Sequence, residues 1–553
     1  MSAVTGARVS AVGEDPGDAP TDRDDGRVLH LVSVAACVPF LWIVTWVVLD
    51  PVVPSDRYPR GVAVALAALA LLLAPLVVRL LGRAVPWLER RPVARRAAVA
   101  ATLVGVGGVQ VRTGSAVRFP PGWDAGVMET LAHGLAFDYL PPEQAVLSIN
   151  QYPNNALLTA VLARWLELFR WAGVDNPDLS YVVLNALVMC ASIGLAYAVA
   201  RRIASPLTAY VTLLLAAAMM TLSPWIGVAY SDTLGMVFPI AVAWLYTRLH
   251  GASSRPAIAA LWFAMALVGS LGYQIKPTAV FALGAAALVS LLRMRWRSWS
   301  RPATTTRAVT VGALVAGFLL GGVVGERITD GVGITPTAAS SELAMPLTHF
   351  LMMGAQSSSY YGSYWGDDVA LTMSVPAGEQ RFWNGVRVYR ERVGEMGPLG
   401  YATFLHKKAS WTFGDGSFFA YGEGGMGAEP TPYRNTDPLS RSIQRWMGPH
   451  GEHFGLVLAW WQVVWLAVLA LVALPAAWWR RDLSTPATTM LRVALVMLLV
   501  FLLLFETRPR YLYLYLPYFV VLAAVTAVAL SDRFDRALRR KVPGGGAGPA
   551  SCA

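Results

Sequence analysis

Residues Gly61–Leu81 read GVAVALAALALLLAPLVVRLL, an apolar run broken only by Pro75 and Arg79. A run of about 18 or more apolar residues is long enough to cross the hydrocarbon core of a bilayer, roughly 30 Å thick, as a helix. Unbroken Leu, Ala and Val favour helices, because strands of a membrane barrel alternate apolar and polar residues. Similar runs recur along the 553-residue chain, which is 55% hydrophobic and only 14% charged. The sequence therefore predicts an all-α polytopic membrane protein.

These runs predict twelve membrane spans. In chain order they are Val28–Leu49, Gly61–Leu81, Ala97–Val111, Leu179–Ala200, Pro206–Leu222, Thr233–Thr247, Ala257–Tyr273, Thr278–Leu292, Ala308–Gly325, Phe454–Trp478, Thr489–Phe505 and Tyr511–Leu530. A further segment, Ala156–Ala172, is apolar but carries Arg164, Glu167 and Arg170. We interpret this segment as a re-entrant or interfacial helix, because a full crossing would move the next basic cluster to the outer side. If it does cross, the chain has thirteen spans.

Basic residues set the predicted orientation. They cluster in short turns between spans, namely at Arg79, Arg83, Arg90, Arg91, Arg95 and Arg96, at Arg201 and Arg202, at Arg293, Arg295, Arg297 and Arg301, at Arg480 and Arg481, and at 533–541. Because Lys and Arg favour cytoplasmic loops, we expect these turns and both termini on the cytoplasmic side of the plasma membrane. The net charge of +11 follows from these clusters. We find no nucleic-acid motif and expect no nucleic-acid partner.

This orientation divides the chain into two tails, two transmembrane parts and one large outer region. In order they are a disordered cytoplasmic tail at 1–26, an N-terminal transmembrane bundle at 27–325 with a first extracytoplasmic loop at 112–155, a large extracytoplasmic loop region at 326–453, C-terminal transmembrane helices at 454–531, and a cytoplasmic tail at 532–553. The region at 326–453 is too long for a simple connector, so we expect it to contribute to function.

Two aspartates at outer edges are the candidate catalytic residues. Asp124 lies in Pro-Pro-Gly-Trp-Asp-Ala-Gly, residues 120–126, just past a span and before an amphipathic stretch. Its carboxylate is placed to accept a proton from an acceptor hydroxyl, as a general base. Asp232, in Tyr-Ser-Asp-Thr at 230–233, is a candidate to orient a sugar, support Asp124 or help bind a cation. For both aspartates the alternative is a helix N-cap, a position that Asp also favours.

Four basic side chains are candidates for binding a phosphate. Lys276 lies between two spans, where a lone ammonium is costly and indicates a function; the alternative is snorkelling to the interface. Arg508 and Arg510 fall in a short outer turn, against the positive-inside pattern, and a lipid phosphate would explain them. Their alternative is pairing with Glu506 or with lipid headgroups. His349, in an amphipathic segment of the long loop, is interpreted as a phosphate donor or as a structural residue.

Polar and aromatic residues near these groups are candidates for binding the substrates. They are Tyr152, Asn154, Tyr361, Trp365, Asp367 and Asp368. The first two belong to Tyr-Pro-Asn-Asn, residues 152–155, at a bilayer edge. The aromatic side chains of the long loop have the right shape to stack on sugar rings, and the alternative is an interfacial aromatic belt. The two aspartates follow this aromatic stretch directly.

Together these segments resemble the GT-C superfamily of membrane glycosyltransferases. They look closest to the bacterial relatives of dolichyl-phosphate-mannose–protein mannosyltransferases and to the aminoarabinose transferases of lipid A. The resemblance runs from Trp123 to Tyr518. It rests on the order and shared outer placement of the first-loop Asp, Tyr-Pro-Asn-Asn, Tyr-Ser-Asp-Thr, Ile-Lys-Pro-Thr and Arg-Pro-Arg-Tyr. It implies a GT-C-like bundle of about 12–13 transmembrane helices with extracytoplasmic loops.

The resemblance also implies roles for individual residues. Asp124 corresponds to the base and Asp232 to a second acidic group, while Lys276 and Arg510 correspond to contacts with the donor phosphate. Many members of the superfamily carry two adjacent acidic residues in the first loop, whereas Ala125 follows Asp124 here. This departure leaves a divalent metal ion as an open alternative, and no other cofactor is implied.

The predicted function is transfer of a hexosyl or pentosyl group from a polyprenyl-phosphate donor to an extracytoplasmic glycan, lipid or protein of the cell envelope. The expected partners are this donor, the acceptor and membrane lipids. The base deprotonates the acceptor, one displacement inverts the anomeric centre, and fixed cations stabilise the departing phosphate. A transporter or lipid flippase of cell-envelope precursors is the alternative, although it would more often show paired internal repeats. A non-catalytic envelope scaffold is the third class.

Overall fold

A computed structural model describes residues 21–541, except 53–57, 120, 140, 142, 250, 294–300, 335–337, 359, 421–432, 434 and 475. Within these residues every regular element is a helix and none is a strand, so the predicted all-α class is confirmed. The predicted tails lie largely outside the described residues. Where they are described they are helical, since the first helix begins at Thr21 and the last ends at Lys541.

The helices follow one another with short connections. The first half of the chain contains α1 (Thr21–Ala35), α2 (Val38–Leu49), α3 (Arg60–Glu89), α4 (Pro92–Val117), α5 (Asp124–Ala136), α6 (Glu143–Gln151), η1 (Pro153–Asn155), α7 (Ala156–Trp171), α8 (Pro177–Ile203), α9 (Pro206–Met220), η2 (Pro224–Gly227), α10 (Ser231–Leu234), α11 (Val237–Leu249) and α12 (Arg255–Ile275). The second half contains η3 (Pro277–Val280), α13 (Phe281–Arg293), α14 (Arg301–Asp330), α15 (Ala338–Leu343), α16 (Leu347–Gly354), α17 (Gly366–Met373), α18 (Glu379–Phe413), α19 (Pro438–Met447), α20 (Phe454–Ala473), η4 (Ala476–Trp478), η5 (Arg481–Leu483), α21 (Pro486–Leu504), η6 (Pro509–Tyr515) and α22 (Leu516–Lys541).

Eight helical segments of the described chain are long and apolar enough to cross a membrane, which makes this a multi-pass membrane protein. They are Gly26–Leu49, Arg60–Glu89, Pro177–Ile203, Arg255–Ile275, Arg307–Asp330, Phe454–Ala473, Pro486–Leu504 and Pro509–Ala537. Each coincides with one of the twelve predicted spans.

The other four predicted spans differ from the prediction. The apolar helices Pro206–Met220 and Pro277–Arg293 are shorter than 18 residues. The span predicted at Thr233–Thr247 is divided between α10 and α11. α4 has 26 residues but is not among the eight apolar segments. Its buried Gln110 donates to the carbonyl oxygen of Met220 at 2.8 Å and so satisfies the end of α9.

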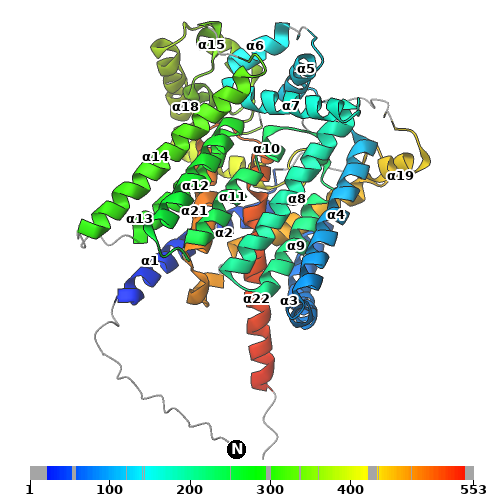
Figure 1. Ribbon diagram of the computed structural model, residues 1–553, viewed down its shortest axis with the longest axis vertical. Helices are drawn as coiled ribbons and strands as arrows, with labels where there is room; N and C mark the ends of the chain where they lie inside the picture. The colour runs from blue at the N-terminus through cyan, green and yellow to red at the C-terminus, as the bar shows by residue number, and fades with distance from the viewer. Residues whose placement is uncertain are drawn as a thin grey trace, which may run out of the picture.

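The segment interpreted as re-entrant or interfacial forms α7, a helix of 16 residues. Figure 1 shows α7 running across the ends of more upright helices such as α8 and α14. Arg164 pairs with Glu167 at 2.6 Å on its exposed face, and Arg170 donates to the carbonyl oxygen of Ala136 at 3.1 Å. This orientation agrees with an interfacial helix, which can keep its charged side chains in water.

Ion pairs join the basic turns at one end of the molecule. The pairs are Arg79–Asp535 at 3.5 Å, Arg201–Glu89 at 2.6 Å and Arg480–Asp532 at 3.1 Å. Figure 1 shows α1 and the free end of α22 at this basic end, while α5, α6 and α15 lie at the opposite end. The molecule is thus polarised as the arginine pattern requires, and the side of the membrane that each end faces stays a prediction.

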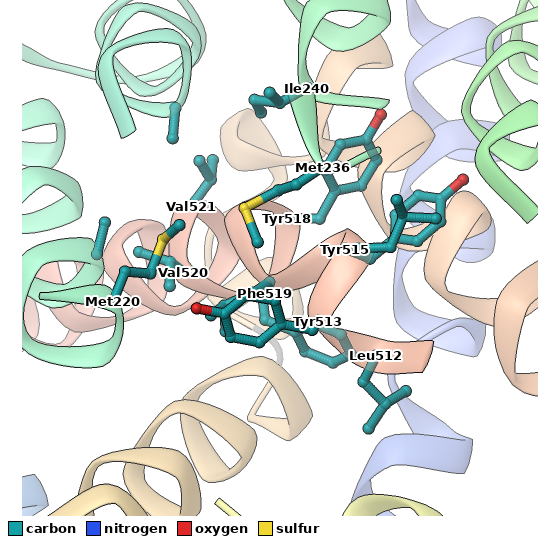
Figure 2. Packing of buried hydrophobic residues seen from close by; sticks show 14 of the residues in the cluster. Met220, Met236, Ile240, Leu512, Tyr513, Tyr515, Tyr518, Phe519, Val520 and Val521 are labelled. Atoms are coloured by element: carbon teal, nitrogen blue, oxygen red, sulfur yellow. The ribbon is translucent and has the colours of Figure 1, made fainter. Parts of the chain in front are cut away.

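The segment from η6 into α22 forms the centre of the bundle and is almost entirely buried. Figure 2 shows its side chains packed against residues of neighbouring helices, with Tyr513, Tyr515, Tyr518 and Phe519 close to Met220, Met236 and Ile240. The Tyr515 hydroxyl donates to the carbonyl oxygen of Thr278 at 2.9 Å, and the Tyr518 hydroxyl donates to that of Pro239 at 2.7 Å. These hydrogen bonds fix η6 against the turn that follows Lys276.

Candidate functional site

A cavity of about 420 Å³ lies where α5, η1, α10, η3, α16 and η6 come together. α5 lies at the end of the molecule opposite the basic end (Figure 1). The polar side chains in the cavity wall are Asp124, Tyr152, Asn154, Asn155, Tyr230, Lys276, Thr278, His349, Tyr364, Glu506, Arg508, Arg510 and Tyr511. The structure therefore brings together seven of the twelve residues that the sequence singled out as a site.

Asp124 is the first residue of α5 and faces the cavity. The N-cap is Trp123, whose side chain makes no capping hydrogen bond, so the capping alternative for Asp124 is wrong. The Tyr230 hydroxyl donates to Asp124 Oδ2 at 3.4 Å. A Cβ atom at Gly126 would lie 1.9 Å from the carbonyl oxygen of Pro121, so glycine is required for the tight turn that places Asp124 here.

A buried ion cluster fixes the position of α5. Arg118 bonds Glu129 of α5, and its Nε lies 3.3 Å from Asp178 at the start of α8. Arg118 also donates to the carbonyl oxygen of Gly227. Removing one member of a buried ion cluster leaves an uncompensated charge, which strongly destabilises the folded state. The carboxylate of Asp124 is therefore carried by a helix that is rigidly attached to the bundle.

Two cations in the cavity wall share one buried carboxylate. Lys276 Nζ lies 3.0 Å from Asp232 Oδ1, and Arg510 Nε lies 3.3 Å from Asp232 Oδ2. Asp232 is 1% exposed and is not itself part of the cavity wall. It follows Ser231 inside α10, whose N-cap is Tyr230, so capping is not its role either. Its position is that of a support for the two cations, and the snorkelling alternative for Lys276 is wrong.

Arg508 and Glu506 form a second, looser pair in the wall. Arg508 Nε lies 3.8 Å from Glu506 Oε1, and the Tyr511 hydroxyl donates to the same oxygen at 3.1 Å. Burial raises the pKa of Glu506, against the opposing effect of the nearby arginines. The sequence alternative of pairing with Glu506 is thus observed for Arg508, and it coexists with a guanidinium that lines the cavity.

Two tyrosines connect the acids to the cations. Tyr230 bonds Asp124 through its hydroxyl, while Arg510 lies 5.0 Å and Lys276 5.7 Å from its ring centroid. Tyr511 bonds Glu506 through its hydroxyl, while Lys276 lies 4.0 Å from its ring centroid. A cation over an aromatic face is attracted by the ring quadrupole. Both tyrosines stand in segments quoted from the sequence, but their type alone gave no reason to choose them.

His349 lines the cavity from α16 as an uncharged ring. Its Nδ1 lies 2.7 Å from Thr372 Oγ1, and burial lowers the pKa of His349 to about 4. The predicted role as a charged phosphate donor does not fit this environment. Tyr152 and Asn154 lie in the same wall, as predicted for substrate contacts.

Four predicted substrate residues lie outside the cavity wall. Asp368 is buried in α17 and bonds Arg392 of α18 through both oxygens, at 2.6 and 2.9 Å, so it is structural. Asp367 is exposed. Trp365 is the N-cap of α17, and Tyr361 packs its ring 6.4 Å from that of Phe404. Tyr364 takes the aromatic place in the wall instead, 5.8 Å from the Arg508 guanidinium.

Lys408 supports the wall from behind and was not singled out from the sequence. Its Nζ donates to the carbonyl oxygens of Gly354 at 2.6 Å and Phe505 at 2.7 Å. Burial lowers the pKa of Lys408 to about 7. This side chain connects α18, α16 and the segment before Glu506. The available signal was its rarity, since Lys408 is one of four lysines and lies beside a buried apolar stretch.

The described residues contain no group of three His, Cys, Asp or Glu side chains arranged to hold a metal ion. Asp124 and Glu506 are the acidic residues of the cavity wall, and Glu506 is already engaged by Tyr511 and Arg508. No step is assigned to a metal below.

The fold and the cavity define a polytopic membrane protein with a charged site at one end. The chain belongs to the family of conserved hypothetical integral membrane proteins, whose model matches residues 60–530. No curated protein matches the sequence significantly.

Two solved structures are similar to this chain at low identity. One is the archaeal oligosaccharyltransferase AglB from Archaeoglobus fulgidus in complex with an inhibitory peptide and a dolichol-phosphate, with 11% identity and a TM-score of 0.36 over 83% of this chain. This chain spans about half of that protein, 53% of its length. The other is ArnT from Cupriavidus metallidurans bound to undecaprenyl phosphate, with 12% identity and a TM-score of 0.30 over 81% of each chain.

Proposed function

We propose that this protein is a membrane glycosyltransferase that uses a polyprenyl-phosphate sugar and an extracytoplasmic acceptor. The observation that carries the proposal is the charge balance of the cavity. Lys276 and Arg510 together bring two positive charges to the one carboxylate of Asp232. One positive charge therefore remains for a ligand, and the phosphodiester of a lipid-linked sugar carries one negative charge.

The surroundings of these cations favour a lipid-linked phosphate over a soluble one. Phe501 and Phe505, at the end of the membrane-crossing helix α21, form part of the cavity wall. Leu347, Phe350 and Met353 of α16 add further apolar surface. A phosphate between Arg510 and Arg508 would leave its isoprenoid chain next to these side chains, where burial of apolar surface is favourable.

The chemistry then needs a base and a place for the leaving charge. Asp124 takes the proton of an acceptor hydroxyl as that oxygen attacks the anomeric carbon of the donor. The bond between the anomeric carbon and the phosphate oxygen breaks, and its electron pair leaves with the polyprenyl phosphate. Lys276, Arg508 and Arg510 stabilise the charge that develops there. One in-line displacement inverts the anomeric centre.

Release of lipid phosphate tests the proposal directly. The purified protein in nanodiscs would be given citronellyl phosphates linked to mannose, glucose, galactose or arabinofuranose, with an envelope lipid and glycan extract as acceptor. We expect free citronellyl phosphate from at least one donor with the parent protein, and almost none with Asp124→Asn. Transbilayer movement of a lipid-linked sugar without any bond cleavage would instead support a flippase and overturn the proposal.

The proposed orientation has its own test. In a variant lacking native cysteines, an impermeant thiol reagent applied to intact cells should label Asp367→Cys, since Asp367 is exposed at the cavity end. It should not label Arg90→Cys, in the turn after α3 at the basic end. The reverse pattern would place the cavity in the cytoplasm and exclude an extracytoplasmic reaction. The proposed division into tails, bundle and outer region depends on the same result.

A further inference from the structure

Three neutral polar atoms in the cavity wall have no hydrogen-bond partner among the described residues. They are His349 Nε2, Trp123 Nε1 and Thr278 Oγ1, each with almost no exposed surface. More than nine in ten buried polar groups in native proteins are paired. Their gathering in one wall, apart from the cations, therefore requires a reason that phosphate binding does not supply.

Hydrogen bonding fixes which nitrogen of His349 carries the proton. The Thr372 hydroxyl donates its single hydrogen to the carbonyl oxygen of Asp368 at 2.9 Å, one turn earlier in α17. Its oxygen is then an acceptor for His349 Nδ1, which must carry a hydrogen to make the 2.7 Å contact. In an uncharged imidazole the other nitrogen is then unprotonated. His349 Nε2 is a pure acceptor in the cavity wall.

A support holds this acceptor in place. Arg392 of α18 bonds both carboxylate oxygens of Asp368, and Arg392 also donates to the carbonyl oxygen of Met352 in α16 at 2.7 Å. The two helices that carry His349 and Thr372 are thus attached to the same guanidinium. The orientation of the imidazole is set by the protein before any ligand arrives.

We infer that this wall recognises hydroxyl groups of the transferred sugar, with His349 accepting and Trp123 donating a hydrogen bond. The inference rests on the proposed function, and it makes His349 a specificity-determining residue in place of a phosphate ligand. An ionised phosphate diester has no hydrogen to give to His349 Nε2, and an isoprenoid chain has neither donor nor acceptor. A sugar hydroxyl offers both, and it is the group on the proposed donor that satisfies all three atoms.

Two matched variants separate the two nitrogens of the ring. His349→Asn keeps a donor close to the position of Nδ1 for Thr372 but has no acceptor at the position of Nε2. His349→Gln reaches the position of Nε2 with its amide oxygen and gives up the bond to Thr372. Binding to detergent-purified protein would be measured for citronellyl methyl phosphate and for the citronellyl phosphates of mannose, glucose, galactose and arabinofuranose. All five probes carry a single phosphodiester charge.

We expect at least one glycosylated probe to bind the parent more tightly than citronellyl methyl phosphate does. His349→Asn should weaken that probe about three- to tenfold, the usual effect of one neutral hydrogen bond, and leave citronellyl methyl phosphate unchanged. His349→Gln should recover part of the loss. Equal loss for both probes would mean that His349 acts on the phosphate or on the fold, and no loss would mean that water satisfies these atoms; either result overturns the inference.

The same measurement separates this inference from the function on which it rests. If the parent binds none of the five probes, the lipid-phosphate site itself is wrong, and the sugar wall falls with it. If the parent binds all five equally, the phosphate site stands and the sugar wall is refuted.

Discussion

The two ends of this molecule use the same charged side chains in opposite ways. At the basic end Arg480 and Asp532 pair at 3.1 Å with side chains 25% and 50% exposed. At the cavity end Lys276 and Arg510 pair with Asp232, whose side chain is 1% exposed. Water and salt screen the first kind of pair. The second kind has little water to replace a missing partner, so each charge there depends on its neighbours.

This difference indicates which charges belong to topology and which to chemistry. At the basic end each of the three pairs that join the turns matches one cation with one acid. At the cavity end two cations meet one acid, and Asp124 stands apart with a tyrosine hydroxyl. The comparison holds if variants at the two ends differ in kind as well as in size.

The largest effect is expected for Asp124→Asn. Asparagine keeps the shape but cannot accept the proton, and a general base typically contributes about 10²–10⁴-fold to the rate. Transfer measured by release of citronellyl phosphate should fall by that factor, with probe binding and thermal unfolding unchanged. Asp367→Asn, at an exposed position of the same end, is the control and should keep the parent rate. Transfer at close to the parent rate by Asp124→Asn would refute its role as base.

Asp232→Ala should have the second largest effect, on stability. It leaves Lys276 and Arg510 without their buried counter-ion, which costs roughly 3–5 kcal/mol. The midpoint of thermal unfolding in detergent should drop clearly. Adding Lys276→Met to Asp232→Asn should recover part of the loss, because the two residues are coupled. An Asp232→Ala protein as stable as the parent would show that the buried pairing contributes nothing.

Removing single cations from the wall should weaken donor binding. Loss of a charge-assisted contact costs about 1.5–3 kcal/mol, so Lys276→Ala and Arg510→Ala should each bind citronellyl methyl phosphate about ten- to a hundredfold more weakly. Arg480→Ala removes a cation from the basic end and should bind this probe as the parent does. Unchanged affinity in both cavity variants would rule out the phosphate assignment.

A smaller, pH-dependent effect is expected from Glu506. Burial raises the pKa of Glu506, so in the folded protein this carboxyl stays neutral to a higher pH than usual. As the pH rises through that raised pKa, a negative charge appears 3.8 Å from Arg508 and opposes an anionic ligand. Affinity for citronellyl methyl phosphate should therefore fall with rising pH in the parent.

The matched variant for this effect is Glu506→Gln. It should remove the pH dependence and match the parent at low pH, while binding about three- to tenfold more tightly once the parent carboxyl is ionised. The probe keeps a constant charge over this range, so a slope that persists in Glu506→Gln would have to come from another group and would exclude Glu506.

The smallest effect is expected at the basic end. Arg480→Ala removes a largely solvated pair with Asp532 and a local one with Asp482, and such exposed pairs contribute at most about 1 kcal/mol. Unfolding should shift slightly and sugar transfer should not change. A loss of stability as large as that of Asp232→Ala would end the distinction between the two ends.

The spans were largely predictable because apolar length is a local property of the sequence. Eight of them could be read from runs such as Gly61–Leu81. The division of Thr233–Thr247 into α10 and α11 could not, since the break accompanies contacts with η6, nearly three hundred residues further along the chain. Likewise nothing near α9 in the sequence shows that Gln110 of α4 satisfies its end.

The site was predictable as far as misplaced charge allows. Lys276 and Arg510 stood out because a cation at membrane depth is costly without a function. That both share Asp232 is a three-dimensional fact, and so is the uncharged state of His349, which depends on burial and on Thr372. Asp368 was misassigned because its partner, Arg392, lies on another helix and turns an apparent loop acid into a strut.

The short helices determine how deep the reaction would take place. At 1.5 Å per residue, the 15 residues of α9 rise only about 22 Å, less than a bilayer core of roughly 30 Å. α9 and the broken α10–α11 therefore stop below the membrane surface, and the irregular stretches between them line a sunken vestibule. A donor whose phosphate rests at the surface of the leaflet would enter this vestibule sideways, without being lifted out of the lipid. The acceptor has to come down to meet it, and long or branched acceptors would then be limited by the width of the opening.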